Sequence, residues 1–365
     1  MKKVFLVATV AVVVACALIA GGCGQTDEEK KQDEDILAGM SLEEKVGQLF
    51  MIGVQGTEMT PETQELLETI HPGGVILFGR NIQDADQLTK LIEGLQGVAA
   101  ADTGHPLFVS TDQEGGEIVR IKWLDDGVAE ADITGTDQAY NIGVKRGQGL
   151  KGLGINQNLA PVLDMCQPDD FLMEYKRCFP GNPQEMGELG KSVISGQRDG
   201  GILSTAKHFP GYGGIDFDPE NDRIPTVPQV PETSQFKVAA EAGPEFIMTA
   251  NVIYEDIDAD TPFTLAPAGI EYLRNEVGGD YLIITDDLAS KVLKAAYTMG
   301  GTVVMAAKAG NDVLLISANQ PEDPMAAYSA LLDAVKNGEI SEGELDARVT
   351  RILRLKKRLP QSTGS

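Results

Sequence analysis

The chain has 365 residues, of which 42% are hydrophobic and 23% are charged. A chain of this length and composition can bury a large core, which excludes disorder over its whole length. Its formal net charge is -25. A surface this acidic repels phosphate backbones, so we expect no nucleic-acid partner.

The first residues are typical of an exported protein. Lys2 and Lys3 precede residues 4–20, which are uncharged and apolar apart from Thr9. This stretch is shorter than the roughly 20 apolar residues that span a bilayer. Its length therefore favours a cleaved signal peptide over an uncleaved membrane anchor.

The residues before Cys23 resemble the lipobox of bacterial lipoproteins, with Ala20 where Leu is usual. We therefore predict a signal peptide over residues 1–22 and lipidation of Cys23. Residues 24–35 are polar and charged, as a solvated tether should be, so residues 23–36 are predicted to be the lipidated Cys and its tether. These features predict a protein on the extracytoplasmic face of the cell membrane, which it contacts only through the lipid anchor.

Two further cysteines, Cys166 and Cys178, belong to the predicted mature chain. An oxidising compartment would allow a disulfide between them. Two buried free thiols are an equally good interpretation of the sequence.

Residues 37–360 are predicted to form one domain, in which short apolar runs alternate with amphipathic stretches. The runs are rich in Val, Ile and Leu, as strands buried on both faces are. Eight runs occupy residues 48–54, 73–78, 106–112, 155–161, 201–209, 245–251, 281–287 and 312–317. Eight strands that alternate with helices predict a single-domain (β/α)8 barrel. A doubly wound open sheet is the main alternative, but no G-x-G-x-x-G motif follows the first run.

Local signals mark the ends of several helices. Ser41 and Glu44 have the spacing of a capping box before the first strand. Thr60 and Pro61 combine an N-cap residue with Pro at the first helical position. Residues 341–359 are predicted to form a final amphipathic helix with a basic end.

The active site of such a barrel lies at the carboxyl ends of its strands. The polar side chains near these ends are Asp112, Asp164, Arg177, Lys207, His208, Asn251, Thr285, Asp286 and Asp287. Carboxylates suit an oxocarbenium-like transition state, and Lys, Arg and Asp suit sugar hydroxyls. The three His residues lack metal-ligand spacing and no phosphate-binding loop is recognisable, so we expect neither a metal nor a cofactor.

Seven stretches resemble glycoside hydrolase family 3, in particular its single-domain bacterial β-N-acetylhexosaminidases. They follow the family's order across nearly the whole predicted mature chain, and K-H-F-P-G followed by T-D-D-L is the specific combination. The stretches are KVGQLFMIG (45–53), GGVILFGRNI (73–82), TDQEGG (111–116), LAPVLDM (159–165), AKHFPGYG (206–213), IITDDL (283–288) and AGNDVLL (309–315).

The resemblance implies roles for individual residues. Asp286 matches the catalytic nucleophile, whose attack would form a covalent glycosyl-enzyme with retention of configuration. Nearby cations are expected to keep this carboxyl ionised. Asp287 is expected to be structural because strand alternation directs it away from Asp286. The expected sugar-binding residues are Asp112, Arg177, Lys207, His208 and Asn251.

The loop after the K-H-F-P-G motif departs from the family pattern. The family places an Asp-Ser-His triplet there, and its His is the general acid/base. This chain reads KHFPGYGGIDFDPENDRIP, with Asp218 at the family's Asp, Glu220 at its His, and Tyr212 at the second His of the preceding motif.

We prefer Glu220 as the general acid/base, with Asp218 as its support. A Glu beside a nucleophilic carboxylate has a raised pKa, as a general acid requires. One alternative is that Asp216, Asp218 or Asp222 supplies the proton. The other is that the acid is absent and the protein binds sugar without turnover.

The leading functional hypothesis is a retaining exo-β-glycosidase, with β-N-acetylhexosaminides as the expected substrates. β-Glucosidase or β-xylosidase specificity is the nearest alternative, because no acetamide pocket can be recognised in the sequence. A non-catalytic, lipid-anchored carbohydrate-binding protein is the alternative of a different class, and the replaced His favours it. We expect a carbohydrate as the partner and a monomer as the oligomeric state.

Overall fold

The computed structural model describes residue 31, residues 35–318 and residues 320–359. The predicted signal peptide, Cys23 and most of the predicted tether lie outside these residues. Within the described part of the chain, no helix is both long and apolar enough to cross a bilayer.

Eight parallel strands form a closed barrel. They are β1 (Phe50–Gly53), β2 (Gly74–Ile76), β3 (Phe108–Thr111), β6 (Gln157–Asn158), β7 (Leu203–Phe209), β9 (Phe246–Thr249), β11 (Leu282–Thr285) and β12 (Leu314–Ile316). Neighbouring strands pair in the order β11-β9-β7-β6-β3-β2-β1-β12. A parallel bridge between Ile284 and Val313 closes the ring. The predicted (β/α)8 barrel is confirmed, and the open-sheet alternative is wrong.

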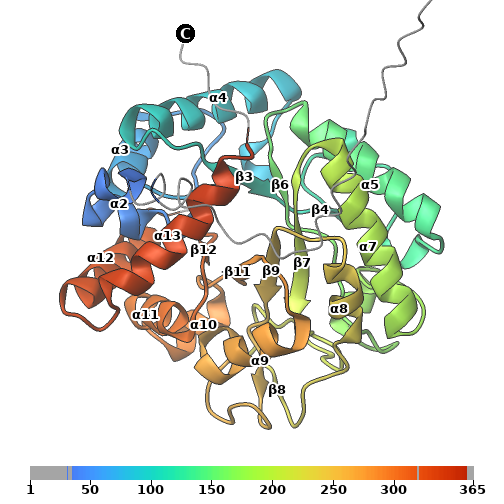
Figure 1. Cartoon of the computed structure of the whole chain (residues 1–365). Coiled ribbons are helices and arrows are strands. Elements are labelled where there is room, and N and C mark those ends of the chain that lie inside the picture. Colours follow the sequence, from blue (N-terminus) through green and yellow to red (C-terminus); the bar gives the residue numbers. More distant parts are fainter. Residues whose placement is uncertain (1–30, 32–34, 319, 360–365) are drawn as a thin grey trace, which may run out of the picture.

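Helices surround the strands as an outer ring (Figure 1). They are α2 (Leu42–Gly47), α3 (Pro61–Ile70), α4 (Ala85–Asp102), α5 (Thr136–Lys151), α7 (Pro183–Gly200), α8 (Ser234–Ala240), α9 (Pro267–Val277), α10 (Lys291–Ala296), α11 (Met299–Ala309), α12 (Glu322–Lys336) and α13 (Glu342–Lys356). Short elements lie in the loops: α6 (Phe171–Glu174), β4 (Gln113–Gly115), β5 (Ile118–Val119), β8 (Thr226–Val227) and β10 (Ile253–Tyr254).

The strands are buried at every position of β1, β2, β3, β7, β9, β11 and β12. This explains their continuous apolar sequences, because one face packs inside the barrel and the other packs against helices. Phe108 and Phe246, the first residues of β3 and β9, meet edge to face with ring centroids 5.3 Å apart. Their rings help to fill the end of the barrel at which the strands begin.

The predicted helix signals are confirmed by hydrogen bonds. Ser41 Oγ accepts from Glu44 N at 3.1 Å, and Glu44 Oε2 accepts from Ser41 N at 2.6 Å. Thr60 Oγ1 accepts from Thr63 N at the start of α3. The predicted last helix is α13, where Ser341 forms a second capping box. Such caps satisfy amide groups that a helix start leaves without partners.

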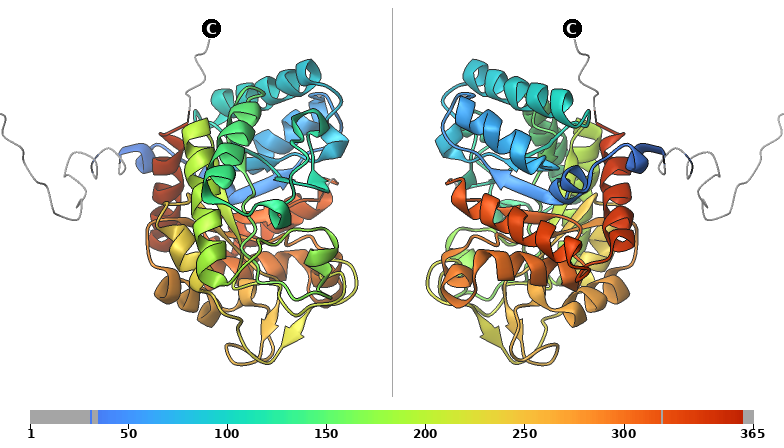
Figure 2. Two further views of the ribbon diagram at one scale, coloured as in Figure 1. Left: turned by 90° about the vertical axis from the view of Figure 1, so that its right-hand side faces the viewer. Right: turned by 90° about the vertical axis from the view of Figure 1, so that its left-hand side faces the viewer.

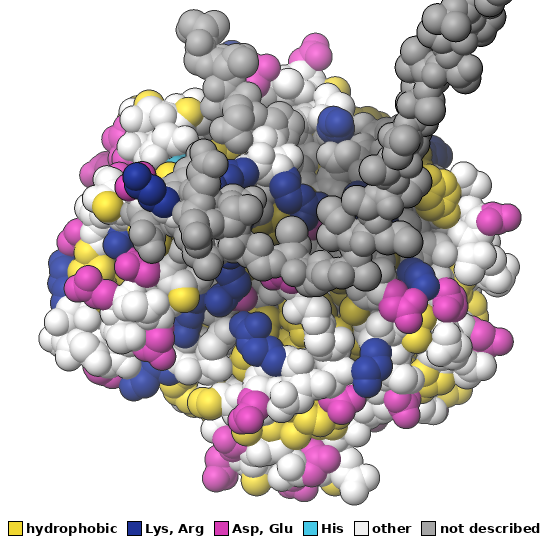
Figure 3. Space-filling view, viewed as in Figure 1, with side chains coloured by type: hydrophobic (Ala, Val, Ile, Leu, Met, Phe, Trp, Pro, Cys, Tyr) yellow, Lys and Arg dark blue, Asp and Glu magenta, His cyan; other side chains and the backbone are white. Residues whose placement is uncertain are grey.

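Helix α13 lies across the barrel end opposite the strand carboxyl ends, as the view along the barrel shows (Figure 1). In the side views, the start of the described chain and α13 lie on the same side of the molecule (Figure 2). Several Lys and Arg side chains gather on this face (Figure 3), and Arg351, Arg354, Lys357 and Arg358 belong to α13 and the residues just after it. The end of the barrel at which the strands finish, where the site is predicted, is therefore free of the chain's first described residues.

The Lys356 ammonium is buried within the closed end of the barrel. The residue is 2% exposed, and its Nζ donates to Gln48 Oε1 at 2.7 Å and lies 5.4 Å from the Phe108 ring centroid. Burial lowers the pKa of Lys356 to about 7. A depressed pKa means that the unfolded chain binds more protons than the folded one between pH 7 and about 10, so this residue makes folding less favourable at neutral pH.

Replacement of Lys356 by Met is therefore expected to raise the free energy of unfolding at pH 7 by about 2 kcal/mol, after the lost bond to Gln48 is allowed for. The difference in unfolding free energy between the variant and wild type should shrink as the pH rises from 7 to about 10. At the higher pH the wild-type Lys356 loses its proton in the unfolded chain as well as in the folded one. Urea unfolding at pH 7, 8.5 and 10 measures this, with Lys357→Met at the exposed neighbour as the control. A pH-independent difference would contradict the prediction.

Candidate active site

A pocket of about 230 Å³, partly open to solvent, lies at the carboxyl ends of the strands. Strand residues Ile76, Met248 and Leu315 give it an apolar base, and its charged groups come from β7 and from the segments that follow the strands. Its polar lining comprises Asp112, Glu114, Arg120, Tyr175, Arg177, Lys207, His208, Asp218, Glu220, Asp286, Asp287 and Ser317. The structure therefore brings these predicted residues together at this end of the barrel: Asp112, Arg177, Lys207, His208, Asp218, Glu220 and Asp286.

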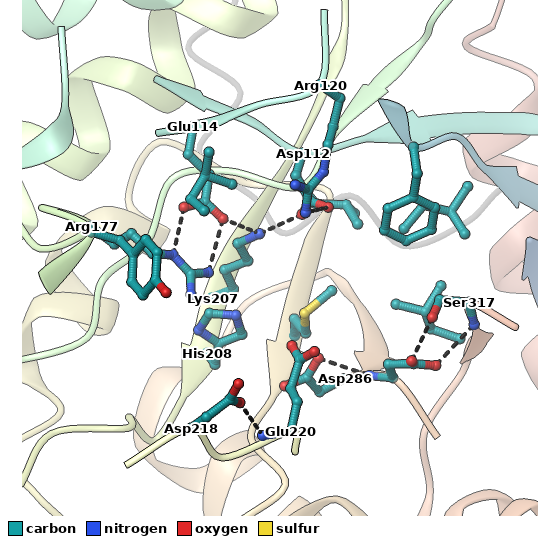
Figure 4. A pocket seen from close by; sticks show the side chains of 18 of the residues that line it. Asp112, Glu114, Arg120, Arg177, Lys207, His208, Asp218, Glu220, Asp286 and Ser317 are labelled. Carbon is teal, nitrogen blue, oxygen red and sulfur yellow. Dashed lines mark hydrogen bonds and ion pairs between the residues drawn. The ribbon is translucent and has the colours of Figure 1, made fainter. Parts of the chain in front are cut away.

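Carboxylates and cations alternate along one wall of the pocket (Figure 4). Lys207, in β7, places Nζ 2.8 Å from Asp112 Oδ1 and 2.7 Å from Glu114 Oε1. Arg177 binds Glu114 with two nitrogens, at 2.8 and 3.0 Å. Arg120 lies 3.2 Å from Asp112 Oδ2. We name these five side chains the charged wall.

Electrostatics keeps the two carboxyls and the Lys207 ammonium of the charged wall ionised. Burial alone would raise the pKa of Asp112, but the charges of Lys207 and Arg120 outweigh it and hold that pKa well below its ordinary value. In the same way, Arg177 and Lys207 overcome the burial of Glu114 and lower its pKa to about 2. Burial alone would lower the pKa of Lys207, whereas Asp112 and Glu114 raise it. Fixed charges and donors of this kind suit hydroxyl groups of a sugar.

His208 is held by a buried carboxylate. Its Nδ1 lies 2.7 Å from Asp164 Oδ2, and Asp164 is fully buried. A carboxylate can only accept, so Nδ1 donates to Asp164 and Nε2 is left for the pocket. Asp164 Oδ1 also accepts from Tyr212 N at 2.6 Å. Asp164 thus positions both His208 and the backbone of Tyr212 and does not itself line the pocket.

Asp286 follows β11 directly and accepts hydrogen bonds from two donors. Asp287 N donates to its Oδ1 at 2.7 Å, and the Tyr212 hydroxyl donates to its Oδ2 at 2.6 Å. Lys207 and Arg177 instead bind the carboxylates of the charged wall. The hydrogen-bond donors of Asp286 are therefore neutral groups, while these two cations pair with the carboxylates of the charged wall.

Glu220 extends from the loop after β7 toward Asp286 (Figure 4). The residue as a whole is exposed, because the loop has a solvent-facing side, yet its carboxyl lines the pocket. Burial of the carboxyl first, and then the charges of Asp286 and Asp287, raise the pKa of Glu220 to about 7. Such a group carries a proton in slightly acidic water and can release it near neutrality.

Asp218 shapes the loop that presents Glu220. Its Oδ1 accepts from Glu220 N at 2.9 Å and from Asn221 N at 3.2 Å, and its Oδ2 accepts from Asn221 Nδ2 at 2.8 Å. This is a local Asp turn of the kind that loops commonly use. Asp216 and Asp222 are exposed and are not among the residues that line the pocket.

Two further predicted residues, Asn251 and Asp287, differ in their position relative to the pocket. Asn251 does not belong to the pocket lining; its Nδ2 donates to Asp287 O at 3.0 Å. Asp287 lines the pocket, but its carboxyl accepts from Ser317 N at 2.9 Å and from Ala289 N at 3.0 Å, as a structural residue would.

Glu114, Arg120 and Tyr212 bind predicted site residues directly but have no role in the sequence prediction. Glu114 stands inside the TDQEGG motif, so its sequence context pointed to the site. Arg120 lies close to Asp112 because β4 and β5 form an antiparallel hairpin, which reverses the chain between the two residues. For Tyr212, the replaced motif His was the available signal.

A disulfide joins Cys166 to Cys178, whose Cα atoms are 6.1 Å apart, which favours the first of the two hypotheses for these cysteines. It closes the loop after β6 immediately beside Arg177. We expect the double variant Cys166→Ser/Cys178→Ser to lose about 2–3 kcal/mol of unfolding free energy, because the unfolded chain regains loop freedom.

Urea unfolding of the variant and of reduced wild-type protein should give the same loss. Alkylation before reduction should add no mass at these two cysteines in the folded or the unfolded wild-type protein. Two alkyl groups on the unfolded, unreduced protein would show that the thiols are free.

The chain matches known proteins over most of its length. Residues 41–355 match the Glycosyl hydrolase family 3 N terminal domain. A secreted glycosyl hydrolase of Arthroderma benhamiae is 31% identical over 337 residues, which cover 88% of this chain and 94% of that protein. A beta-hexosaminidase of Idiomarina loihiensis is 31% identical over 326 residues, covering 83% of this chain and 92% of that protein.

Among solved structures, a glycoside hydrolase family 3 beta-N-acetylglucosaminidase from Paenibacillus superposes with a TM-score of 0.82 and 34% sequence identity. The match covers 90% of this chain and 66% of the Paenibacillus chain, which is therefore the longer of the two. Family model, relatives and fold agree with the resemblance seen in the motifs. This chain belongs to glycosyl hydrolase family 3 and is a glycoside hydrolase.

Proposed function

We propose that the protein is a retaining exo-β-glycosidase that hydrolyses terminal β-linked N-acetylhexosamines. The observation that carries the proposal is the contrast between two carboxyls in one pocket. Asp286 is held by two donors beside the barrel, whereas burial and neighbouring charges favour a proton on Glu220. A nucleophile and a general acid need this contrast.

In the proposed reaction, Asp286 attacks the anomeric carbon while Glu220 gives its proton to the departing glycosidic oxygen. A covalent glycosyl-enzyme results. Glu220, now a carboxylate, takes a proton from water as the water attacks the same carbon and releases Asp286. Two displacements at one carbon return the original β configuration.

The charged wall and His208 would bind the hydroxyls of the terminal sugar. Asp112 and Glu114 offer acceptors, while Lys207, Arg177 and Arg120 offer donors. Because these groups are already paired with one another, they need little reorganisation when a sugar arrives. The preference for an N-acetylated sugar is supported by the relatives named beta-hexosaminidase and by the Paenibacillus beta-N-acetylglucosaminidase.

A non-catalytic carbohydrate-binding protein is the second candidate, motivated by the absence of the family's His at position 220. The raised pKa of Glu220 and its position beside Asp286 favour catalysis instead. β-Glucosidase or β-xylosidase specificity is the alternative within the enzyme class.

The test is a set of p-nitrophenyl β-glycosides of N-acetylglucosamine, N-acetylgalactosamine, glucose and xylose. We expect the highest kcat/KM with N-acetylglucosamine, and NMR of early product should show the β anomer. The α anomer first would refute retention. A higher kcat/KM for glucose or xylose would refute the substrate assignment. Sugar binding in calorimetry without turnover would establish the binding-protein alternative.

We also propose that the protein acts outside the cytoplasm as a lipid-anchored monomer, in keeping with the secreted relative. The anchor would be at Cys23, and the active-site end of the barrel would face away from the first described residues (Figure 2). Detergent-phase partitioning that persists in Cys23→Ala would refute the anchor, and light scattering gives the mass in solution.

A further inference from the structure

The Tyr212 side chain lies against Asp286, and we infer that it is a positioning residue for the nucleophile. Its hydroxyl donates to Asp286 Oδ2 at 2.6 Å, orients the carboxylate for attack, and stabilises it when it departs from the sugar. The inference rests on the proposed nucleophilic role of Asp286. It assigns a catalytic purpose to the position at which the chain departs from the family's K-H-F-P-G-H-G motif.

The direction of the Tyr212 hydroxyl is set by its second partner. Asn251 N donates to the hydroxyl oxygen at 2.9 Å. A hydroxyl has one proton, and a backbone N–H cannot accept it, so this proton points to Asp286. Asp287 N occupies the other oxygen, Oδ1, at 2.7 Å. Each oxygen of Asp286 thus has one donor, and the plane of the carboxylate is defined by both.

Tyr212 is itself rigidly placed. It is 4% exposed, its backbone N donates to Asp164 Oδ1, and its ring packs edge to face against His208 with centroids 5.1 Å apart. Asp164 binds Nδ1 of that same His208. One buried carboxylate therefore sets both a sugar-facing imidazole and the tyrosine that holds Asp286.

The proton stays on Tyr212 at neutral pH. Burial first, and then the charge of Asp286, raise the pKa of Tyr212 well above its ordinary value. The hydroxyl is therefore a permanent donor and does not take part in proton transfer. It differs in this respect from Glu220, whose pKa lies near neutrality.

The two chemical steps depend differently on this bond. In the first step, an Asp286 oxygen forms a bond to the anomeric carbon as the bond to the leaving group breaks, and the carboxylate charge disappears. In the second step, water bonds to that carbon, the carbon–Asp286 bond breaks, and its electron pair returns to Asp286. A donor at Asp286 stabilises the charge that develops in this second step. Loss of the hydroxyl should therefore slow deglycosylation more than glycosylation.

The test is Tyr212→Phe, assayed with the 2,4-dinitrophenyl β-glycoside of the sugar that wild type prefers. This leaving group departs without a proton, so the first step does not depend on Glu220. We expect kcat to fall by about 10- to 100-fold. KM should fall with it, so that kcat/KM changes by less than about threefold, because the glycosyl-enzyme accumulates. A burst of dinitrophenolate and the added sugar mass in the intact protein report the intermediate.

Tyr254→Phe is the matched control. Tyr254, in β10, is a buried tyrosine whose hydroxyl donates to Gly211 O, next to Tyr212 in the chain, rather than to Asp286. It loses a comparable hydrogen bond but should retain wild-type kcat and KM without a burst. If Tyr212→Phe behaves as this control does, or raises KM while kcat falls, the role of Tyr212 is structural and the inference is wrong.

Replacement of Tyr212 by 3-fluorotyrosine keeps the hydroxyl, so this protein should have the wild-type kcat and show no burst. It tests the inference even if the Tyr212→Phe protein fails to fold. Accumulated intermediate in the fluorotyrosine protein would overturn the inference. Wild-type protein without turnover on any glycoside would overturn the proposed function together with it. Active wild type with an unaffected Tyr212→Phe would overturn the inference alone.

Discussion

Asp286→Asn is expected to lower kcat by about 10³-fold or more, because an amide cannot form the glycosyl-enzyme. The replacement preserves size and still offers an oxygen to Asp287 N or to the Tyr212 hydroxyl. The fold and the charged wall should therefore persist, and KM should change much less than kcat. Initial rates with the preferred p-nitrophenyl β-glycoside measure the loss.

Added azide distinguishes a missing nucleophile from a disturbed site. A small anion that replaces Asp286 would attack once, so the product of Asp286→Asn should be the α-glycosyl azide. Asp287→Asn is the matched control, because the Asp287 carboxyl accepts hydrogen bonds from Ser317 N and Ala289 N and has no proposed role as a nucleophile. The Asp287→Asn variant should lose about tenfold or less in kcat and should form no α-glycosyl azide. A tenth or more of wild-type activity in Asp286→Asn would remove Asp286 from its proposed role.

Glu220→Gln is expected to lower kcat/KM by about 10²- to 10⁴-fold for substrates whose leaving group needs a proton. For the dinitrophenyl glycoside the first step should be almost unaffected. The pH dependence follows from the pKa of about 7: wild type needs the protonated acid, so kcat/KM should fall as the pH rises through 7. Gln cannot titrate, and the variant should lose this alkaline limb.

Rates from pH 5 to 9 with two leaving groups measure these effects. Azide should give the β-glycosyl azide with Glu220→Gln, because Asp286 remains and two displacements occur. Asp216→Asn and Asp222→Asn are the controls, since both residues are exposed members of the same loop outside the pocket lining. An unchanged alkaline limb in Glu220→Gln, or its loss in either control, would transfer the acid role to another residue.

The pH dependence has a structural cause that the sequence suggested only in part. The sequence places Glu220 at the family's His and predicts a raised pKa beside a carboxylate. Whether the Glu220 carboxyl faces the pocket depends on the Asp218 turn and on a bond from Val292 N to Glu220 O at 3.3 Å. That second contact joins the loop after β7 to α10. Loop conformation of this kind follows from contacts between distant segments, so periodicity does not predict it.

The fold itself was predictable because its determinants are local. Runs such as residues 281–287 are apolar throughout, and a strand buried on both faces requires this. The capping boxes at Ser41 and Ser341 lie within four residues of their partners. Closure of the ring between Ile284 and Val313 follows once eight parallel strands carry helices on their outer face.

The sequence by itself determined the barrel, the family, and the strand ends at which Asp112, Lys207 and Asp286 lie, because burial patterns and motifs are contained in short stretches of consecutive residues. Only the tertiary structure decided which donors reach Asp286. Tyr212 and Asp286 are 74 positions apart, and they meet because β7 and β11 both pair with β9. A hydrogen bond of 2.6 Å requires the closed barrel and the loop conformation together, and neither is encoded in the residues adjacent to either partner.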